Sequence, residues 1–452
     1  MPPPTISISP GPDAWRSAMA APRAERANDR SVLGLPTDRP IVMSGHQPVL
    51  WHAGILTKLL AAAELAKHTG AALCWIIADM DEVDPTSVRV PDVPNPNKSA
   101  DQSSARVARL LEGDPPAFGV PTGALPPRDA ADDDESIEGL AALLDAYAFE
   151  PTLAMQVGKA VIYQACERFG IDEPTVVSCS DLTQTDAWRS LLHAMEHDTT
   201  GCITAYNNAV VGHHQARMRP MQTDQSRTEL PLWRIRPNLP RLAVFSNQLD
   251  SIPEEELRPR ALTMTALVRA ALCELFVHGT GGGQYDRITN DWFSEWIGGP
   301  GWDLAPTAVA TGDAYADLGV DPKTLPDPAH AIWQAHHARH DPAMLGDEQA
   351  AKAKRVLVGQ ISSIKHAGGD PAPEFAKLQQ LLEETRQRHK DRLAEINELA
   401  LGAQKLAGIR KIALDRTWPW PALPNETLDA LHASIRDWFA SVPSGACTDS
   451  AS

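Results

Sequence analysis

Two histidines, a glutamine and a lysine lie close together in the segment SGHQPVLWHAGILTK, residues 44–58. A histidine can transfer a proton near neutral pH or donate a hydrogen bond to a phosphate oxygen. The segment joins an apolar run, Ile41–Met43, to a helix-like run, Ile55–Lys67, and the free N–H groups at a helix start favour an anion. Ordinary turn chemistry, with His46 capping the chain, is the alternative. The candidate site residues are Gly45, His46, Gln47, His52 and Lys58.

A second candidate is the acidic segment that follows the apolar run Ala71–Ala78 and reads DMDEVD, residues 79–84. Four carboxylates at the end of a strand repel one another unless a cation or a hydroxyl-rich substrate offsets their charge. Such a group can bind Mg²⁺, orient a sugar or accept a proton. A solvated acidic loop is the alternative. The position directly after a strand favours function for Asp79 and Asp81.

Two arginines and two further residues are candidates for binding a substrate. Arg258 and Arg260 stand beside an apolar run, and guanidinium groups suit carboxylate or phosphate. A surface ion pair is the usual role of a single arginine and is the alternative here. Glu229 and Trp233 are secondary candidates for lining a pocket, although a buried tryptophan more often belongs to the core.

The segment HGTGGGQYD, residues 278–286, has glycine at four of the five positions 279–283. Such a backbone can approach a ligand closely or present a group of N–H donors, whereas a simple hinge is the alternative. Gln284 stands where a dinucleotide fingerprint has its third glycine, and we predict no strand–helix–strand unit with a downstream acidic residue around the segment. We predict a ligand-binding loop formed by His278, Gly279, Gly281, Gly282, Gly283, Tyr285 and Asp286.

These segments need a parallel sheet to bring them together. Ile41–Met43, Ile55–Lys67 and Ala71–Ala78 form a strand, a helix and a strand within about forty residues, which predicts a right-handed βαβ unit. Ligands of parallel sheets bind beyond the carboxyl ends of the strands. We therefore expect the segments at residues 44–58 and 79–84 at one edge of an α/β sheet, with Thr175–Ser178 as a further buried strand.

The chain of 452 residues is too long for one ordinary core. We predict two long helices near the C-terminus, separated by the break Ala367–Pro373, as an antiparallel hairpin. An imperfect heptad stripe on the second helix fits either packing on the main body or a protruding, dimerising coiled coil. The predicted parts are an irregular lead-in at 1–38, a core at 39–340 with an insertion at about 92–150, the hairpin at 341–412, a helix returning to the core at 413–441 and a disordered tail at 442–452.

The composition bounds the possible partners. The 43% hydrophobic and 22% charged residues are those of a soluble globular protein. A net charge of −17 argues against nonspecific binding to nucleic acid or to an anionic membrane. The first residues lack the pattern of a signal peptide, no apolar stretch is long enough for a membrane helix, and the cysteines are scattered without a CxxC pair. We expect a cytoplasmic protein with reduced thiols.

Several of these motifs resemble one known family, the bacillithiol-biosynthesis cysteine-adding enzymes. Residues 44–51, with Gly54, Thr57 and Lys58, are similar to the opening motif of that family. Residues 75–82 resemble its next strand and acidic motif, and Arg258-Pro259 and the glycines at 279–283 resemble later motifs. His46 replaces the first glutamine of a family pair, and the acidic motif lacks the histidine of the family.

The resemblance implies a Rossmann-like core related to nucleotidylyltransferases and a coiled coil that forms a homodimer. It implies a ligase that joins cysteine, or a related amino acid, to the amine of an amino-sugar conjugate after ATP activates a carboxylate. Mg²⁺ is a further candidate cofactor. By motif match, the resemblance places His46, Gln47, Lys58, Asp79 and Asp81 in the core site. A nucleotidylyltransferase and a non-catalytic dimerising or binding protein are the alternative functions.

Overall fold

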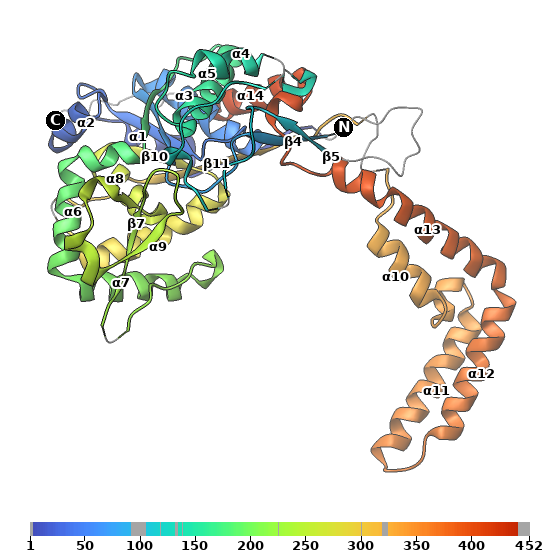
Figure 1. Ribbon diagram of the computed structural model, residues 1–452. Coiled ribbons are helices and arrows are strands. Elements are labelled where there is room, and N and C mark those ends of the chain that lie inside the picture. The colour runs from blue at the N-terminus through green and yellow to red at the C-terminus, as the bar shows by residue number, and fades with distance from the viewer. Residues whose placement is uncertain are drawn as a thin grey trace, which may run out of the picture. The chain divides into compact units, whose positions relative to one another are not determined.

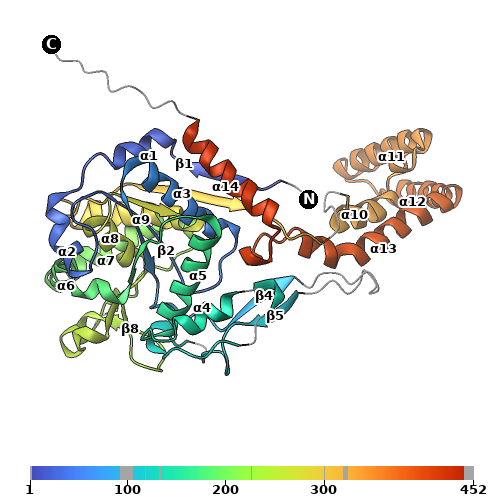
Figure 2. The same ribbon diagram turned by 90° about the horizontal axis from the view of Figure 1, so that it is seen from above.

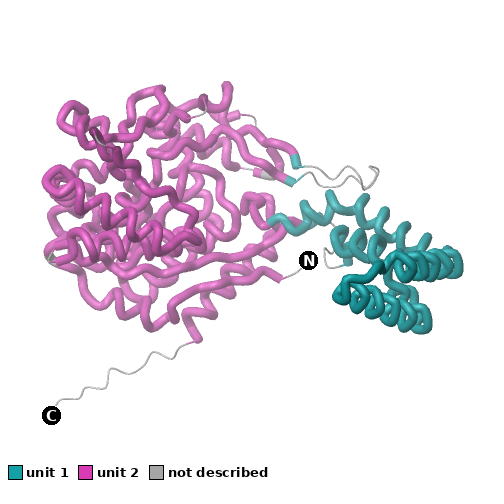
Figure 3. Tube along the Cα trace, turned by 90° about the horizontal axis from the view of Figure 1, so that it is seen from below, with its two compact units in different colours: residues 1–2, 91–105, 317–415 teal, residues 3–90, 106–316, 416–452 magenta. Residues whose placement is uncertain are grey.

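The computed structural model describes residues 3–91, 105–117, 119–131, 134–137, 139–224, 226–299, 301–318 and 324–441 (Figure 1). The chain forms two compact units, coloured separately in Figure 3. We call them the α/β unit (residues 3–90, 106–316 and 416–452) and the helical unit (residues 1–2, 91–105 and 317–415).

A six-stranded, mostly parallel sheet forms the centre of the α/β unit. Its spatial order is β1-β11-β10-β2-β3-β6, and only the pairing of β1 with β11 is antiparallel. The predicted strand–helix–strand unit at the start of the core is therefore confirmed. The strands are β1 (Thr5–Ser9), β2 (Ile41–His46), β3 (Ala72–Ile77), β6 (Thr175–Ser178), β10 (Leu275–His278) and β11 (Thr307–Asp313).

The order of the parallel strands reverses between β2 and β10. From β2 the chain builds outward through β3 to β6 on one side, and β10 followed by β11 is added on the other side. In open α/β sheets the loops that leave two such neighbouring strands diverge to opposite faces, and a crevice remains between them. The fold thus predicts a ligand site at the carboxyl ends of β2 and β10.

Helices cover both faces of this sheet (Figures 1 and 2). The helix α3 packs on β2, β3 and β11, and α14 packs in turn on α3, with α5 on the same side. Met43, Cys74 and Ile76 point to the opposite face, where they join one apolar core with residues of α6–α9. The bounds are α3 (Ala53–Thr69), α5 (Leu153–Phe169), α6 (Asp186–His197), α7 (Thr199–Gly212), α8 (Ala261–Ala271), α9 (Thr280–Trp296) and α14 (Asn425–Ala440).

Both ends of α3 are set by its sequence. The Nδ1 atom of His52 accepts a hydrogen bond from the backbone N–H of Gly54 at 3.0 Å, which caps the first turn. Gly70 ends the helix in the left-handed conformation, with φ of 71°, where glycine has no steric penalty. The capping histidine and the last residues of β2 therefore occupy the same edge of the sheet.

Smaller sheets flank the main one. A three-stranded sheet with the order β8-β7-β9 follows α7, and a short two-stranded sheet is formed by β4 and β5. A further helix, α4, precedes α5. Their bounds are β4 (Ser87–Pro91), β5 (Ala105–Arg109), α4 (Leu140–Ala146), β7 (Glu229–Arg234), β8 (Leu242–Phe245) and β9 (Leu257–Pro259).

The helical unit consists of two packed pairs of helices. Neighbours α11 and α12 pack against each other, and α10 packs against α13. The predicted second long helix is interrupted at His389, so it forms two helices instead of one. The bounds are α10 (Pro328–Ala338), α11 (Glu348–His366), α12 (Ala372–Arg388) and α13 (Lys390–Ala413).

Two predicted boundaries are wrong. The lead-in at 1–38 is not irregular, because β1 lies at the edge of the main sheet and is followed by α1 (Pro12–Ala18) and α2 (Ala27–Val32). The core does not extend to residue 340, because the helical unit begins at residue 317 and includes α10. After the helical unit the chain forms α14, which packs on α3 and β1 within the α/β unit. Residues 92–104 of the predicted insertion and the predicted tail at 442–452 lie outside the described residues.

Candidate functional site

A cavity of about 380 Å³ opens in the α/β unit at the carboxyl ends of β2 and β10. It lies at the reversal of strand order, where ligands of such sheets bind. Three predicted segments that are distant in the sequence meet in its wall. The predicted residues that line it are Gly45, His46, Gln47, His52, Lys58, Asp81, His278, Gly279, Gly281, Gly282 and Tyr285. We call this cavity the crevice.

Lys58 is a buried cation in the wall of the crevice. Its side chain rises from α3 and its Nζ atom donates a hydrogen bond to the carbonyl oxygen of Gly45 at 2.5 Å. Only 4% of the residue is exposed, and burial lowers the pKa of its amine to about 7. Within the described part of the chain, no carboxylate forms an ion pair with Lys58, so an anionic ligand would supply its missing counter-charge.

Two histidines line the crevice together with Lys58, and one of them, His46, is neutral at physiological pH. Burial lowers the pKa of His46 to well below its usual value, and the charges of Lys58 and His52 lower it further. The Nδ1 atom of His52 accepts the hydrogen bond that caps α3, which leaves the proton of the neutral ring on Nε2. His46 is thus suited to accept a proton, whereas the ring of His52 caps α3.

The predicted glycine loop is instead the first turn of α9, and a βαβ unit surrounds it, contrary to that part of the prediction. β10, α9 and β11 form a parallel strand–helix–strand unit. Glycine is a poor helix former, which concealed the start of the helix in the sequence. Gly279 has no side chain with which to cap the turn, so the N–H groups of Thr280, Gly281 and Gly282 have no partner within the helix. They lie in the crevice wall and favour an anion.

A buried ion pair supports the side chain of His278. Its Nε2 atom lies 2.6 Å from Oδ2 of Asp286, and Oδ1 of Asp286 lies 3.5 Å from Nη1 of Arg269. Asp286 and Arg269 are each only 2% exposed. A Cβ atom at Gly282 would collide with the ring of His278, so glycine is needed for the helix to approach. Asp286 therefore orients His278 from behind the crevice wall and does not line the crevice.

The two acidic candidates, Asp79 and Asp81, lie in different surroundings. Asp81 lines the crevice, where its carboxylate pairs with Arg241 at 3.0 Å and accepts a hydrogen bond from Gln47 at 3.1 Å. Asp79 is 4% exposed and accepts a hydrogen bond from the backbone N–H of Ser180 at 3.1 Å. It joins the end of β3 to the segment after β6. Burial raises the pKa of Asp79 to about 6.

Replacing Asp79 with asparagine should stabilise the protein at neutral pH. The folded state holds the Asp79 proton up to a pKa of about 6, against 3.8 for the free group, so the charge costs stability above that window. We expect Asp79→Asn to raise the free energy of unfolding by about 1–3 kcal/mol near pH 7.5, and the gain to vanish near pH 4. Urea unfolding between pH 4 and pH 7.5 measures the gain in stability and its dependence on pH. An equal loss of stability at every pH would contradict the assignment.

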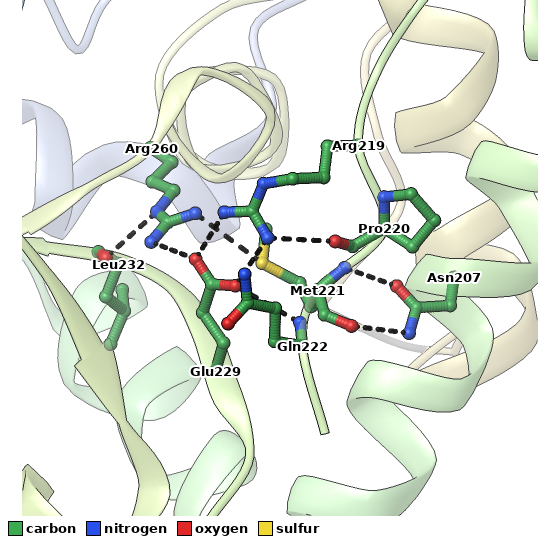
Figure 4. Close-up of polar contacts among 8 residues, drawn as sticks. All are labelled: Asn207, Arg219, Pro220, Met221, Gln222, Glu229, Leu232 and Arg260. Atoms are coloured by element: carbon green, nitrogen blue, oxygen red, sulfur yellow. Dashed lines mark hydrogen bonds and ion pairs between the residues drawn. The ribbon is translucent and has the colours of Figure 1, made fainter. Parts of the chain in front are cut away.

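Four other predicted residues lie outside the crevice lining. Glu229, 1% exposed, accepts hydrogen bonds from Arg219 at 2.7 Å and from Arg260 at 2.8 Å (Figure 4). The guanidinium groups of Arg260 and Arg241 lie 3.8 and 4.4 Å from the centre of the Trp233 ring. These contacts fix the small sheet around β7. Arg258 donates to Oγ of Ser180 at 2.7 Å.

The fold also places residues in the crevice that the motifs did not indicate. Ile76, Leu262, Met264 and Phe276 form an apolar wall, and Arg416 lies at the crevice with Thr311. Ile76 belongs to the apolar run before Asp79, and the other three belong to the apolar run that follows Arg260. Gly283, although predicted to bind a ligand, packs on Val309 and does not line the crevice.

Three further findings bear on the possible function. Among the described residues, no three His, Cys, Asp or Glu side chains are arranged to hold a metal ion. None of the described helices has both the length and the apolar character needed to cross a membrane. The chain matches no protein-family model and no curated protein.

Proposed function

We propose that the protein is an enzyme that binds a nucleotide triphosphate in the crevice and uses it to join a carboxylate to an amine. The observation that carries the proposal is the first turn of α9, whose N–H groups lie with the buried Lys58 in one cavity wall. Both are suited to phosphate oxygens. The Rossmann-like reading of the core is supported by the strand order, which reverses at this cavity.

The chemistry assigns separate roles to the cavity residues. A carboxylate oxygen of one substrate attacks a phosphorus atom of the nucleotide, and the bond from that phosphorus to its leaving phosphate breaks. Lys58 and the N–H groups of α9 stabilise the charge that develops on the phosphate oxygens. The amine then attacks the activated carbonyl carbon, a neutral imidazole such as His46 accepts its proton, and the phosphate group departs with the electron pair.

The resemblance described above supports a more specific reaction, in which cysteine or a related amino acid is attached to an amino-sugar conjugate. His46, Gln47, Lys58 and Asp81 are the motif-matched residues that line the crevice. The predicted Mg²⁺ ligands do not form a shared site, because Asp79 is bonded to Ser180 and Asp81 to Arg241. The proposal therefore contains no step through Mg²⁺. We place the reaction in the cytoplasm, and the five described cysteines are free thiols.

Calorimetric titration with ATP, cysteine and malyl-glucosamine tests this function, followed by mass spectrometry of the mixture. We expect ATP to bind and an amide product to form, and we expect His46→Ala to lower the rate of product formation about 100-fold or more. The exposed His214 provides a matched control, since His214→Ala should leave the rate unchanged. Release of pyrophosphate without amide formation would indicate a nucleotidylyltransferase. The absence of any binding would support the non-catalytic alternative.

We further propose that the helical unit mediates a homodimer, through an antiparallel coiled coil. Several large apolar side chains of this unit are exposed, which is unusual for a surface without a partner. Sedimentation of the full chain tests this. The exposed residues are Ile332, Trp333, Val356, Val358, Phe375, Leu399, Leu401 and Leu414.

A further inference from the structure

We propose that Arg416 is a second anion-binding residue of the crevice and that its guanidinium group pairs with Asp313 until an anion binds there. This inference rests on the proposed function, because it assigns a residue that contacts the anionic substrate. No motif in the sequence indicates Arg416, which stands almost 360 positions after Lys58 in the chain.

The fold carries Arg416 to the crevice by a separate route. The segment at 416–420 returns from the helical unit and lies beside the loop between β2 and α3, where the N–H of Trp420 donates to the carbonyl oxygen of Trp51 at 2.7 Å. Pro419 forms a backbone bridge with His52. Trp418 and Trp420, 1% and 3% exposed, anchor this segment. Arg416 is thereby positioned among the residues that line the crevice.

The guanidinium group of Arg416 is only partly engaged. Its Nη1 atom contacts Oδ1 of Asp313, the last residue of β11, at 2.5 Å. The two side chains are 48% and 32% exposed, so the pair is accessible to solvent. A guanidinium group has five N–H donors and binds a carboxylate or a phosphate with two of them at once. An anion bound in the crevice can therefore replace Asp313 as the partner of the Arg416 guanidinium group.

The charge around the crevice favours this exchange. Among the described residues that line it, Asp81 carries the one carboxylate, and Arg241 already neutralises that group. Lys58 and Arg416 are the two long cationic side chains of the lining, and they come from α3 and from the segment before α14. Two cations on separate elements suit a ligand with two anionic groups, such as a polyphosphate or a phosphate linked to a carboxylate.

Variants of the two partners give effects of opposite sign. Asp313→Asn removes the competing charge, and we expect it to tighten the binding of inorganic pyrophosphate about three- to tenfold. Arg416→Ala should weaken that binding about tenfold or more, and Arg416→Lys should restore only part of it. A purely structural ion pair predicts something different, because both variants would then break the same contact and weaken binding together.

Calorimetric titration of the full chain with pyrophosphate and with ATP measures these effects, and unfolding curves establish that each variant is folded. In the double variant, Asp313→Asn should lose its effect, because Arg416 is no longer present to be released. Binding that is lost in Lys58→Met but unchanged in both Arg416→Ala and Asp313→Asn would overturn this inference alone. A wild-type chain that binds neither probe would overturn the proposed function and this inference together.

Discussion

Replacing Lys58 with methionine is expected to stabilise the protein and to abolish its binding of ATP. The amine is buried and its pKa is about 7. Its hydrogen-bond acceptor is the uncharged carbonyl oxygen of Gly45, and no carboxylate among the described residues pairs with it. Methionine fills a similar volume without a charge to desolvate. We expect Lys58→Met to raise the free energy of unfolding by roughly 1–3 kcal/mol near pH 6 and to weaken ATP binding more than about 100-fold.

The dependence of this gain on pH identifies its cause. The folded pKa of Lys58 lies below the value of 10.5 for the free amine, so the unfolded state binds more protons between about pH 7 and 10.5. The wild-type protein therefore gains stability as pH rises through this window, and the advantage of Lys58→Met should shrink in the same window. Lys67, exposed on the same helix, provides the control, because Lys67→Met should change neither property. A destabilised Lys58→Met protein that still binds ATP would contradict both assignments.

Replacing Asp286 with alanine is expected to have the largest destabilising effect. The change leaves the guanidinium group of Arg269 buried without its anionic partner, although Arg269 keeps hydrogen bonds to Ala305 and Asn290. Removing one member of a buried ion pair costs about 3–5 kcal/mol, and we expect a loss of that size in the free energy of unfolding. His278 also loses the group that orients its ring, so anion binding in the crevice should weaken.

Urea unfolding of three variants separates charge from packing. Asp286→Ala should lose the most stability, and Asp286→Asn should lose less because the amide keeps the shape of the side chain. Adding Arg269→Met to Asp286→Ala should recover about half of the loss or more, since the uncompensated charge is then removed. Equal losses in Asp286→Ala and in the double variant would indicate that packing, and not charge, is responsible.

The sequence predicted the parts of the fold that depend on local pattern. The apolar run before His46, the good helix formers after His52 and the run before Asp79 follow one another closely enough to specify a βαβ unit. Because parallel strands share a carboxyl edge, the meeting of residues 45–47 with Asp81 could be expected before the structure was known.

The parts that the sequence did not predict depend on contacts between distant residues. Asp79 and Asp81 are separated by one position, yet one is buried against Ser180 and the other lines the crevice, because the turn after β3 directs them to different sides. The glycines at 281–283 have low helix propensity, and α9 forms there because its later residues Ile288, Trp292 and Phe293 are buried in the core. β1 is short and partly exposed, so its sequence carries little hydrophobic signal.

The contact between Asp313 and Arg416 also bears on how this architecture is assembled. The chain leaves the α/β unit after Ala316 and rejoins it at Arg416, and the side chains of Asp313 and Arg416 touch. Closing a gap between such neighbouring points needs a linker of only a few residues, and short closures cost little chain entropy. Residues 317–415 thus have the character of a cassette inserted between Ala316 and Arg416, and exchanging this cassette would leave the strand order of the main sheet unchanged.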